Sequence, residues 1–336
     1  RKYEMATKNK RPDGEGNIRQ RPNGSWEARY IAGTKPDGSP VRRSVYGSTQ
    51  EEVSKKLLEV RKQLEDGLYV EPVKITVGAW FDTWVKVYVM PTKRNNTIGA
   101  YKNVIDRHLR PEIGAVKLQK LRTDQVQAAL NAMTAKGIAP ATVIKAKNVL
   151  HGALKQAVIN NLIPRNVSEG VSLPKLEQEE VNPLSPEEQK LFQEALPATT
   201  TGRALSFILK TGLRIGELCG LRWKDVEGDF FEVRQTIRRT PVFDQQKDEG
   251  GNVEKKPKTS LQTGKPKTKA GRRQVPISAK ARAVLDDQKR AQAEMRLKAG
   301  SSWANNGLIF SADNGKPLEV RNVSRTLYKA LDQISA

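Results

Sequence analysis

The stretch TGLRIGELCGLRW, residues 211–223, follows an apolar run and contains Arg214 and Glu217 three residues apart. Gly212 can adopt a positive φ, so it is expected to end the preceding helix. Arg214 would then begin a second, short helix that carries Glu217 on the same face. A guanidinium at a helix start can bind an anion, because its planar fork matches two phosphate oxygens and backbone N–H groups lie nearby. The alternative from spacing alone is a buried structural Arg–Glu pair.

This stretch, continued by Asp225 and Val226, resembles the first catalytic box of the tyrosine recombinases. The resemblance implies an integrase of the phage and conjugative-transposon type, which cuts and rejoins DNA through a 3′-phosphotyrosine. In that family arginines neutralise the pentavalent transition state, an electrostatic task that needs no metal. The resemblance therefore implies that Arg214 is one of those catalytic arginines and that Glu217 orients it.

The composition of the 336 residues indicates a basic protein of two or three domains, each large enough for a core. A net charge of +22 and a pI near 10.0 favour a polyanionic partner. Lys and Arg are spread through the whole chain, which favours nucleic acid over a membrane. A merely solvated basic surface is the alternative, but such an imbalance costs self-repulsion unless phosphates neutralise it.

The cysteine and histidine content bears on compartment and cofactors. Cys219 is the only cysteine, which predicts no internal disulfide, a reducing compartment and packing as a small apolar residue. His108 and His151 have no partners at metal-ligand spacing, so neither a metal nor another cofactor is expected. The absence of a signal peptide and of a long apolar run predicts a cytoplasmic protein with no membrane partner. The resemblance implies a bacterial cell and association with its nucleoid.

The first predicted domain spans residues 1–66, with a basic tail at about 1–16. Alternating runs at 18–21, 26–32 and 41–46 predict a three-stranded sheet, and residues 49–64, opened by a Thr49–Glu52 capping box, predict one covering helix. This small α+β module leaves one face of the sheet free to enter a major groove. The candidate DNA contacts are Arg19, Arg21, Arg29, Arg42 and Arg43. The segment resembles the arm-type DNA-binding domain of integrases; an ordinary α+β domain with a basic surface is the alternative.

The second predicted domain, residues 75–168, is all-α and follows a linker at 66–74. Helices are expected at about 76–88, 97–109, 123–136 and 140–160, with the aromatic residues of the first helix in the core. Basic side chains on the helix surfaces are candidate phosphate contacts, although plain solvation is the alternative for each one. Their set is consistent with the core-site-binding domain of the same family: Lys93, Arg94, Lys145 and Lys147.

The third predicted domain, residues 180–336, is the N-terminal portion of a mixed α/β, mainly helical catalytic domain, and it follows a hinge at 164–183. Ser185 and Glu188 predict a capped helix. Strands are expected at about 230–237, 274–277 and 308–310, and further helices at 279–297 and 320–331.

A basic segment at 265–273 lies between two of these strands and could be a solvated turn. It resembles the catalytic-lysine hairpin of the family, where a Lys followed by Thr protonates the leaving 5′-oxygen. By this resemblance Lys267, which Thr268 follows, is the matching position. A compact ammonium whose pKa responds to its surroundings suits a general acid. Lys265 and Lys269 are rival candidates, and with Arg272 they are also candidate DNA contacts.

The family pattern continues with a His-x-x-Arg box and a late nucleophilic Tyr, and neither has a counterpart in these residues. Tyr328 is the only tyrosine after Arg214 and is expected to pack with Leu327 and Leu331. The sequence therefore predicts no nucleophile in this chain, a catalytic domain that is incomplete at its C-terminus, and no cleavage by the chain in this form. Its first residue is not Met, so a trimmed start is also expected.

The interpretation favoured by these observations is a site-specific DNA recombinase that integrates or excises a mobile element from a phage or transposon. By resemblance, its partners are duplex DNA with arm-type and core-type sites and three further copies of itself, as a tetramer on paired sites. A non-catalytic DNA-binding or architectural relative is the main alternative, supported by the missing boxes. An RNA-binding protein is disfavoured because no aromatic RNP-like strand is present.

Overall fold

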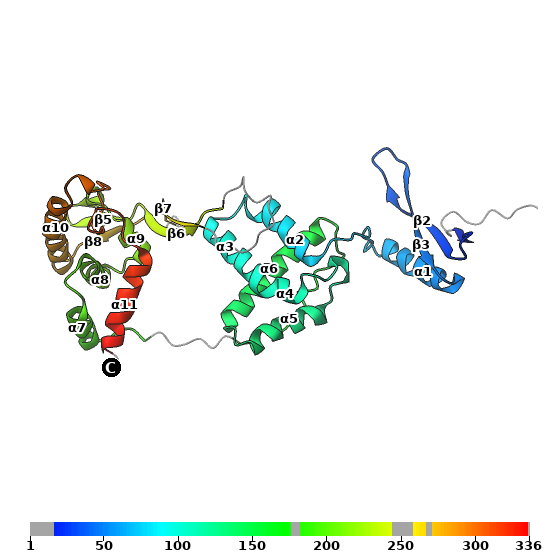
Figure 1. The fold of residues 1–336 in the computed structure, drawn as a ribbon, viewed down its shortest axis with the longest axis horizontal. Coiled ribbons are helices and arrows are strands. Elements are labelled where there is room, and N and C mark those ends of the chain that lie inside the picture. Colours follow the sequence, from blue (N-terminus) through cyan, green and yellow to red (C-terminus); the bar gives the residue numbers. More distant parts are fainter. Residues whose placement is uncertain (1–16, 176–181, 244–257, 267–270, 335–336) are drawn as a thin grey trace, which may run out of the picture. The chain divides into compact units, whose positions relative to one another are not determined.

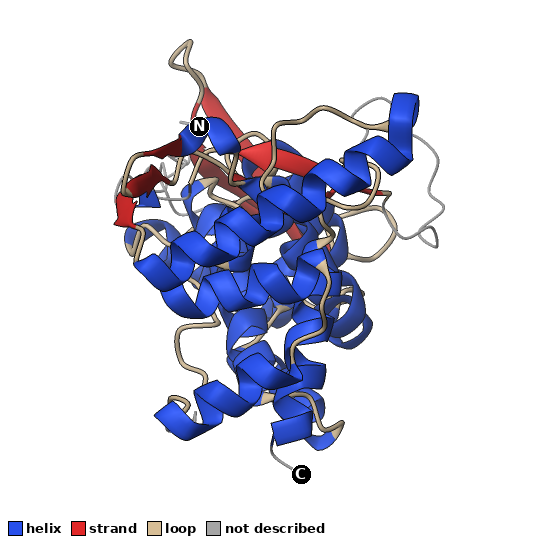
Figure 2. Cartoon of the chain, turned by 90° about the vertical axis from the view of Figure 1, so that its left-hand side faces the viewer, coloured by secondary structure: helices blue, strands red, loops and turns tan. Residues whose placement is uncertain are grey.

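The computed structural model describes residues 17–175, 182–243, 258–266 and 271–334, and divides into two compact units, Arg1–Glu177 and Gln178–Ala336. Helices supply most of the regular structure, with short strands in both units (Figure 2). Among the described residues, no helix is long and apolar enough to cross a bilayer.

The first unit begins with an antiparallel three-stranded sheet, β1 (Asn17–Gln20), β2 (Trp26–Thr34) and β3 (Pro40–Gly47), in the order β1-β2-β3. Helix α1 (Gln50–Glu65) follows and packs on this sheet (Figure 1). Ala28 and Tyr30 on β2 form a small core with Val53 and Leu57 on α1. The predicted sheet with one covering helix is confirmed.

The start of α1 confirms only half of the predicted capping box. Thr49 Oγ1 accepts the Glu52 N–H at 3.2 Å, as an N-cap should. The carboxylate of Glu52 accepts instead from the N–H and the hydroxyl of Ser48, at 2.9 Å each. Glu52 therefore stabilises the turn at Ser48, before the helix, and does not accept from the N–H of the N-cap residue Thr49.

The rest of the first unit is all-helical, as predicted. Trp80, Phe81 and Trp84 are buried, and the Trp80 indole donates to the Ala153 carbonyl at 2.9 Å, which confirms the core role of these aromatics. The helical elements are α2 (Val77–Trp84), the π-helical turn η1 (Val85–Val89), α3 (Asn95–Val104), the π-helical turn η2 (Ile105–Leu109), α4 (Arg110–Ile113), η3 (Leu118–Lys120), α5 (Thr123–Ala135) and α6 (Pro140–Ile159).

The second unit is a mixed fold built around three buried phenylalanines. The ring of Phe207 lies 5.6 Å, centroid to centroid, from each of Phe231 and Phe310. Its sheets are β4-β5-β8 and β6-β7. The elements are α7 (Pro186–Ala195), α8 (Thr200–Thr211), α9 (Ile215–Gly220), η4 (Trp223–Asp225), β4 (Val226–Glu227), β5 (Phe230–Glu232), β6 (Thr236–Pro241), β7 (Thr259–Gly264), β8 (Gln274–Pro276), α10 (Ala279–Ala299), η6 (Gly300–Ser302) and α11 (Val320–Ile334).

The predicted single strand at 230–237 is wrong, because the chain changes sheets within it. Strand β5 pairs with β4 and β8, whereas β6 pairs with β7. Between them, the Val233 N–H bonds the Arg273 carbonyl and the Gln235 side chain donates to the Gly220 carbonyl. These bonds replace the continuous ladder that one strand would need.

The predicted strand at 308–310 is also wrong. Leu308 forms only an isolated bridge with Arg222, although all three residues of the run are buried. The side-chain amides of Gln288 and Gln292 donate to the carbonyls of Ile309 and Leu308 at 2.9 Å each. Because side chains satisfy these carbonyls, the segment needs no neighbouring strand.

Tyr328 does not pack as predicted, since 64% of it is exposed. Helix α11 instead turns Val323, Leu327 and Ala330 toward the core, at a spacing of four and three residues. Tyr328 comes one position after Leu327, about 100° further around the helix. The correction therefore follows from the phase of the helix.

The division between residues 177 and 178 falls within the predicted hinge at 164–183. Part of that hinge, 176–181, lies outside the described residues. The domain bounds 1–66, 75–168 and 180–336 remain predictions.

Candidate functional site

The stretch 211–223 forms the predicted helix, turn and second helix. Helix α8 ends at Gly212, whose φ is +65° and whose N–H bonds the Ile208 carbonyl. Leu213 is buried, and Arg214 is the N-cap residue of α9. A left-handed glycine followed by an apolar anchor thus fixes where the Arg214 side chain starts.

Arg214 and Glu217 form the predicted pair. The carboxylate of Glu217 accepts from the Arg214 N–H at 3.1 Å and from Nη1 at 2.9 Å. Only 5% of the Glu217 side chain is exposed, against 76% of the Arg214 side chain. The alternative of a pair buried as a whole is therefore wrong. Within the described residues, Nε and Nη2 of Arg214 make no hydrogen bond, so that edge of the guanidinium is open to an anion.

Arg273 is the residue of this site that the sequence did not single out. It lies just before β8 and donates from Nη2 to Glu217 Oε2 at 3.0 Å and from Nη1 to Oε1 at 3.3 Å. Burial acts to raise the pKa of Glu217, but the bonds from Arg273 and Arg214 outweigh it and leave the pKa lowered. Glu217 is therefore held as a carboxylate between two guanidinium groups.

Two glycines of α9 bring this site against strand β6. A Cβ at Gly216 would lie 2.7 Å from Thr236 Oγ1 and 2.8 Å from the Ile237 carbonyl oxygen. One at Gly220 would lie 3.1 Å from the Gln235 carbonyl oxygen. Both positions thus permit close contact between α9 and the β6–β7 ribbon, the ribbon that leads to the basic segment at 265–273.

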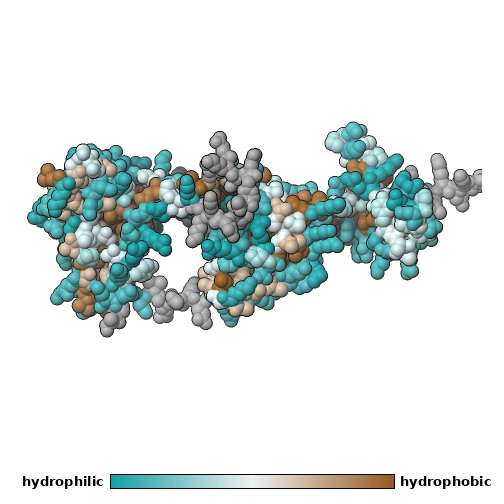
Figure 3. All heavy atoms as spheres, in the orientation of Figure 1, coloured by the Kyte–Doolittle hydropathy of each residue, from teal (hydrophilic) through white to brown (hydrophobic). Residues whose placement is uncertain are grey.

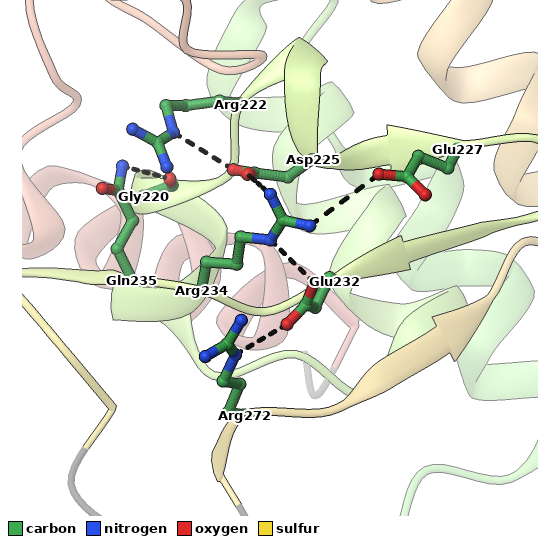
Figure 4. Close-up of polar contacts among 8 residues, drawn as sticks. All are labelled: Gly220, Arg222, Asp225, Glu227, Glu232, Arg234, Gln235 and Arg272. Carbon is green, nitrogen blue, oxygen red and sulfur yellow. Dashed lines mark hydrogen bonds and ion pairs between the residues drawn. The ribbon is translucent and has the colours of Figure 1, made fainter.

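A chain of alternating charges runs from Arg222 to Arg272, the sequence neighbour of Arg273 (Figure 4). Arg222 Nε donates to the buried Asp225 at 3.1 Å, and Arg234 Nη1 lies 3.9 Å from the other oxygen of Asp225. Arg234 and Arg272 each donate to Glu232 at 2.7 Å. The pKa of Glu232 is lowered, first by the bond from Arg272 and then by that from Arg234. The predicted DNA contact Arg272 is thus paired, although 68% of its side chain is exposed.

The candidate lysines follow β7 in the sequence. Lys265 is exposed and immediately follows β7, whereas Lys267 and Lys269 lie outside the described residues. On the neighbouring strand, Arg239 donates from Nε to Glu319 at 3.1 Å, which ties β6 to the residue before α11. The roles of the three lysines remain predictions.

The predicted DNA-binding arginines of the first sheet divide between its two faces. Arg19, Arg29 and Arg42 share the face that α1 leaves uncovered, by their register with Glu27, Ser44 and Ile31. Arg21 lies beside that face, its guanidinium carbon 5.3 Å from the centroid of the Tyr46 ring.

Arg43, the fifth of these candidate contacts, lies on the other face of the sheet. It is paired with Tyr30 in the register, so it lies on the side of α1. It donates to Glu71 at 2.6 Å. The strict alternation of a strand, which turns residue 43 away from residue 42, accounts for the difference.

In the helical part, Lys93, Arg94 and Lys145 are exposed and Lys147 is half-buried. His151 Nδ1 lies 3.1 Å from the Asn166 amide and 3.3 Å from the Ser168 hydroxyl. Cys219 is buried as predicted, and burial raises the pKa of its thiol to about 12. No group of three potential metal ligands occurs in the part of the chain that the structure describes.

Comparisons with known proteins agree on one family. Residues 76–134 match the family model of the phage integrase N-terminal SAM-like domain. The chain is 29% identical to a XerC-like tyrosine recombinase of Caldanaerobacter subterraneus subsp. tengcongensis, across 90% of this chain and 78% of that protein. It is 28% identical to an integrase of Streptomyces ambofaciens, across 91% of this chain and 76% of that protein.

Solved structures show the same fold. A Tn1549 transposon integrase bound to transposon right end DNA matches with a TM-score of 0.61 and 19% identity, across 77% of this chain and 79% of that one. A lambda integrase in a tetramer bound to a Holliday junction matches with a TM-score of 0.60 and 18% identity, across 97% and 83%. These relatives and the box around Arg214 support the tyrosine recombinase family for this chain.

Proposed function

We propose that this protein is a site-specific DNA recombinase, an integrase that cuts and rejoins duplex DNA by phosphoryl transfer through a 3′-phosphotyrosine. The observation that carries the proposal is the open guanidinium edge of Arg214, which is anchored by a buried carboxylate. A fixed cation with two free N–H donors can stabilise charge that develops on a phosphate in the transition state.

In the proposed reaction, a tyrosine hydroxyl attacks the scissile phosphorus and the 5′-oxygen leaves. Arg214 would donate to the non-bridging oxygens, and Glu217 would hold Arg214 in place. Lys267 would give a proton to the departing 5′-oxygen, with Lys265 and Lys269 as the rivals for that role. Arg273 would act through Glu217, as a positioning residue that donates to its carboxylate from the side opposite Arg214 in the sequence, just before β8.

The proposed nucleophile is not among these 336 residues. No histidine follows His151, so the chain has no His-x-x-Arg box after Arg214, and its one later tyrosine, Tyr328, precedes the place of that box in the family. We therefore propose that this chain binds and orients DNA but does not cleave it. Because Tyr328 is exposed, packing does not exclude it as the nucleophile. The argument against Tyr328 is its position, which precedes the place of the His-x-x-Arg box in the family pattern.

The proposed partners are duplex DNA and further copies of the protein. The free sheet face of the first unit would bind arm-type sites, and Lys93, Arg94, Lys145 and Lys147 would contact the backbone of core-type sites. The lambda integrase structure is a tetramer on a Holliday junction, and we propose the same assembly here. Recombination would take place at the nucleoid of a bacterial cell that carries the mobile element.

The test is covalent capture by a form of the protein that also carries the His-x-x-Arg box and late tyrosine of the family. On a nicked duplex that contains the preferred sites, this form should accumulate a phosphotyrosyl adduct, and its Arg214→Lys variant should not. Specific binding without any adduct would instead favour the non-catalytic, architectural alternative.

A further inference from the structure

The side of the first sheet that α1 leaves uncovered, here called the free face, carries one acidic residue among arginines. Cross-strand partners in the antiparallel register lie on the same face, so the register identifies its members. Besides Glu27 it holds exposed Ile31 and Tyr46, each about half accessible. The free face carries Arg19, Glu27, Arg29, Ile31, Arg42, Ser44 and Tyr46.

Glu27 is buried on this face although no helix covers it: only 4% of the residue is exposed. Its Oε2 accepts from Arg19 Nε at 2.8 Å and lies 2.7 Å from Arg19 Nη2. Its Oε1 accepts from the Ser44 hydroxyl at 2.8 Å and from Arg29 Nε at 3.3 Å. One carboxylate therefore joins a side chain from each of the three strands.

The two arginines remain accessible despite these bonds. Their side chains are 51% exposed for Arg19 and 53% for Arg29. Each donates to Glu27 through Nε, and this fixes the plane of the guanidinium while further N–H donors remain for a ligand. By contrast, Arg42 makes no hydrogen bond or ion pair among the described residues, so nothing in them restricts its rotamers.

A negative charge on this face opposes simple attraction to DNA. Non-specific binding depends on the number of phosphates that cations neutralise, and a carboxylate reduces it. Reading a base is different, because the fork of an arginine must meet two acceptors on the edge of guanine at a set angle. A carboxylate that lowers non-specific affinity for DNA but fixes the orientation of two guanidinium groups therefore favours sequence selectivity over binding strength.

We propose that Glu27 is a positioning residue that holds the guanidinium groups of Arg19 and Arg29 for base-edge recognition in the major groove. The inference rests on the proposed function, since it assumes that the free face binds duplex DNA. The bonds from Arg19 and then Ser44 lower the pKa of Glu27 to about 2, so the carboxylate stays charged under all ordinary binding conditions.

The experiment compares Glu27→Gln with Glu71→Gln in the full 336-residue chain. Both changes remove one negative charge from a carboxylate that pairs with arginine, but Glu71 binds Arg43 on the side of α1. Duplexes are first selected from a random pool by the wild-type chain. The affinity of each variant is then measured for a selected duplex and for a scrambled one, at a fixed salt concentration.

Glu27→Gln should lower the ratio of specific to non-specific affinity by about tenfold while raising non-specific affinity. Glu71→Gln should raise both affinities by the same factor and leave the ratio unchanged. If the two variants behave alike, Glu27 is only one more surface charge and the inference is overturned. If the wild-type chain shows no sequence preference at all, the proposed function itself fails, and the two failures are thereby distinguished.

A milder variant covers the case in which Glu27→Gln does not fold. Ser44→Ala removes one bond to Glu27 and no charge, and it should lower the specificity ratio a few-fold. In an Arg29→Ala background the same change should have a smaller effect, because the residue that Glu27 positions is already gone. An unchanged effect in that background, or none in the wild type, would overturn the inference.

Discussion

Arg214 and Arg273 donate to the two oxygens of one carboxylate, that of Glu217, from positions far apart in the sequence. They differ in accessibility: 76% of the Arg214 side chain is exposed, against 32% for Arg273. Arg273 holds the carboxylate from the inner side and leaves Arg214 to face the solvent. The carboxylate is therefore anchored even when Arg214 turns to a ligand.

Arg214→Lys separates catalysis from binding. Lysine cannot reproduce the planar fork, so in a form that carries a nucleophile the cleavage rate should fall by orders of magnitude. Affinity for the DNA site should change little, since many other basic groups contribute to it. Gel-shift titrations and single-turnover cleavage measure the two quantities. Equal losses in both would make Arg214 a structural residue.

Arg273→Ala should lower the free energy of unfolding by about 1–2 kcal/mol, because the buried Glu217 carboxylate loses two charged hydrogen bonds. The neighbouring Arg272→Ala is the control: that side chain is 68% exposed, and its loss should cost no more than about 0.5 kcal/mol. Urea unfolding measures both. A larger loss for the control would contradict the assigned role of Arg273.

The pH dependence of stability should reveal the ionisation of the Glu217 carboxylate. Its pKa in the folded protein is lowered from the ordinary 4.5, so its ionised form is the stabilising one. That contribution is complete above the ordinary pKa and is lost as the pH falls through the folded value. The stability difference between wild type and Glu217→Gln should therefore shrink on acidification, as measured by urea unfolding from about pH 7 to about pH 3. A constant difference would argue against an anchored carboxylate.

Gly216→Ala should disrupt the contact between α9 and β6. The added Cβ would meet the Ile237 carbonyl oxygen at 2.8 Å, so the helix and the strand must separate, at a cost of about 1–3 kcal/mol. Gly264→Ala is a matched change at the end of β7, where the nearest atom would be Arg238 Nη2 at 3.8 Å. Thermal melting should shift clearly for the first variant and little for the second. The reverse order would show that the contact is not tight.

The chain of 336 residues should bind duplex DNA with a steep salt dependence and yet form no phosphotyrosyl adduct with a nicked suicide substrate. Denaturing gel electrophoresis after incubation detects such an adduct. Tyr328→Phe is the matched variant, as Tyr328 is the one tyrosine after Arg214. An adduct that forms with the wild type and is lost in this variant would identify Tyr328 as the nucleophile.

Local patterns predicted much of the fold, because their causes are local. The caps at Thr49 and Ser185, the turn at Gly212 and the first sheet depend on near neighbours in sequence, and each lies where it was predicted. The Arg214–Glu217 pair was predictable for the same reason, since both residues lie on one short helix.

Features that depend on distant partners could not be predicted in this way. Arg273 reaches Glu217 only because β8 pairs with β5, a register that no local pattern contains. The break in the strand after Glu232 depends on hydrogen bonds to the backbones of Gly220 and Arg273. The backbone carbonyls at 308–309 accept hydrogen bonds from two glutamines of α10. In the sequence Glu27 is one more polar residue of a strand, and only the register of the three strands brings Arg19 and Ser44 next to it and Arg29.

Under the proposed function, the free face is also the surface to vary in order to change the DNA preference of this protein. Arg19, Glu27, Arg29 and Ser44 are bonded to one another, so a library that randomises any one of them alters the others as well. Ile31 and Arg42 lie on the same face opposite each other, outside that cluster. Directed evolution that varies these two positions and keeps the cluster would explore new targets with the scaffold of the recognition surface intact.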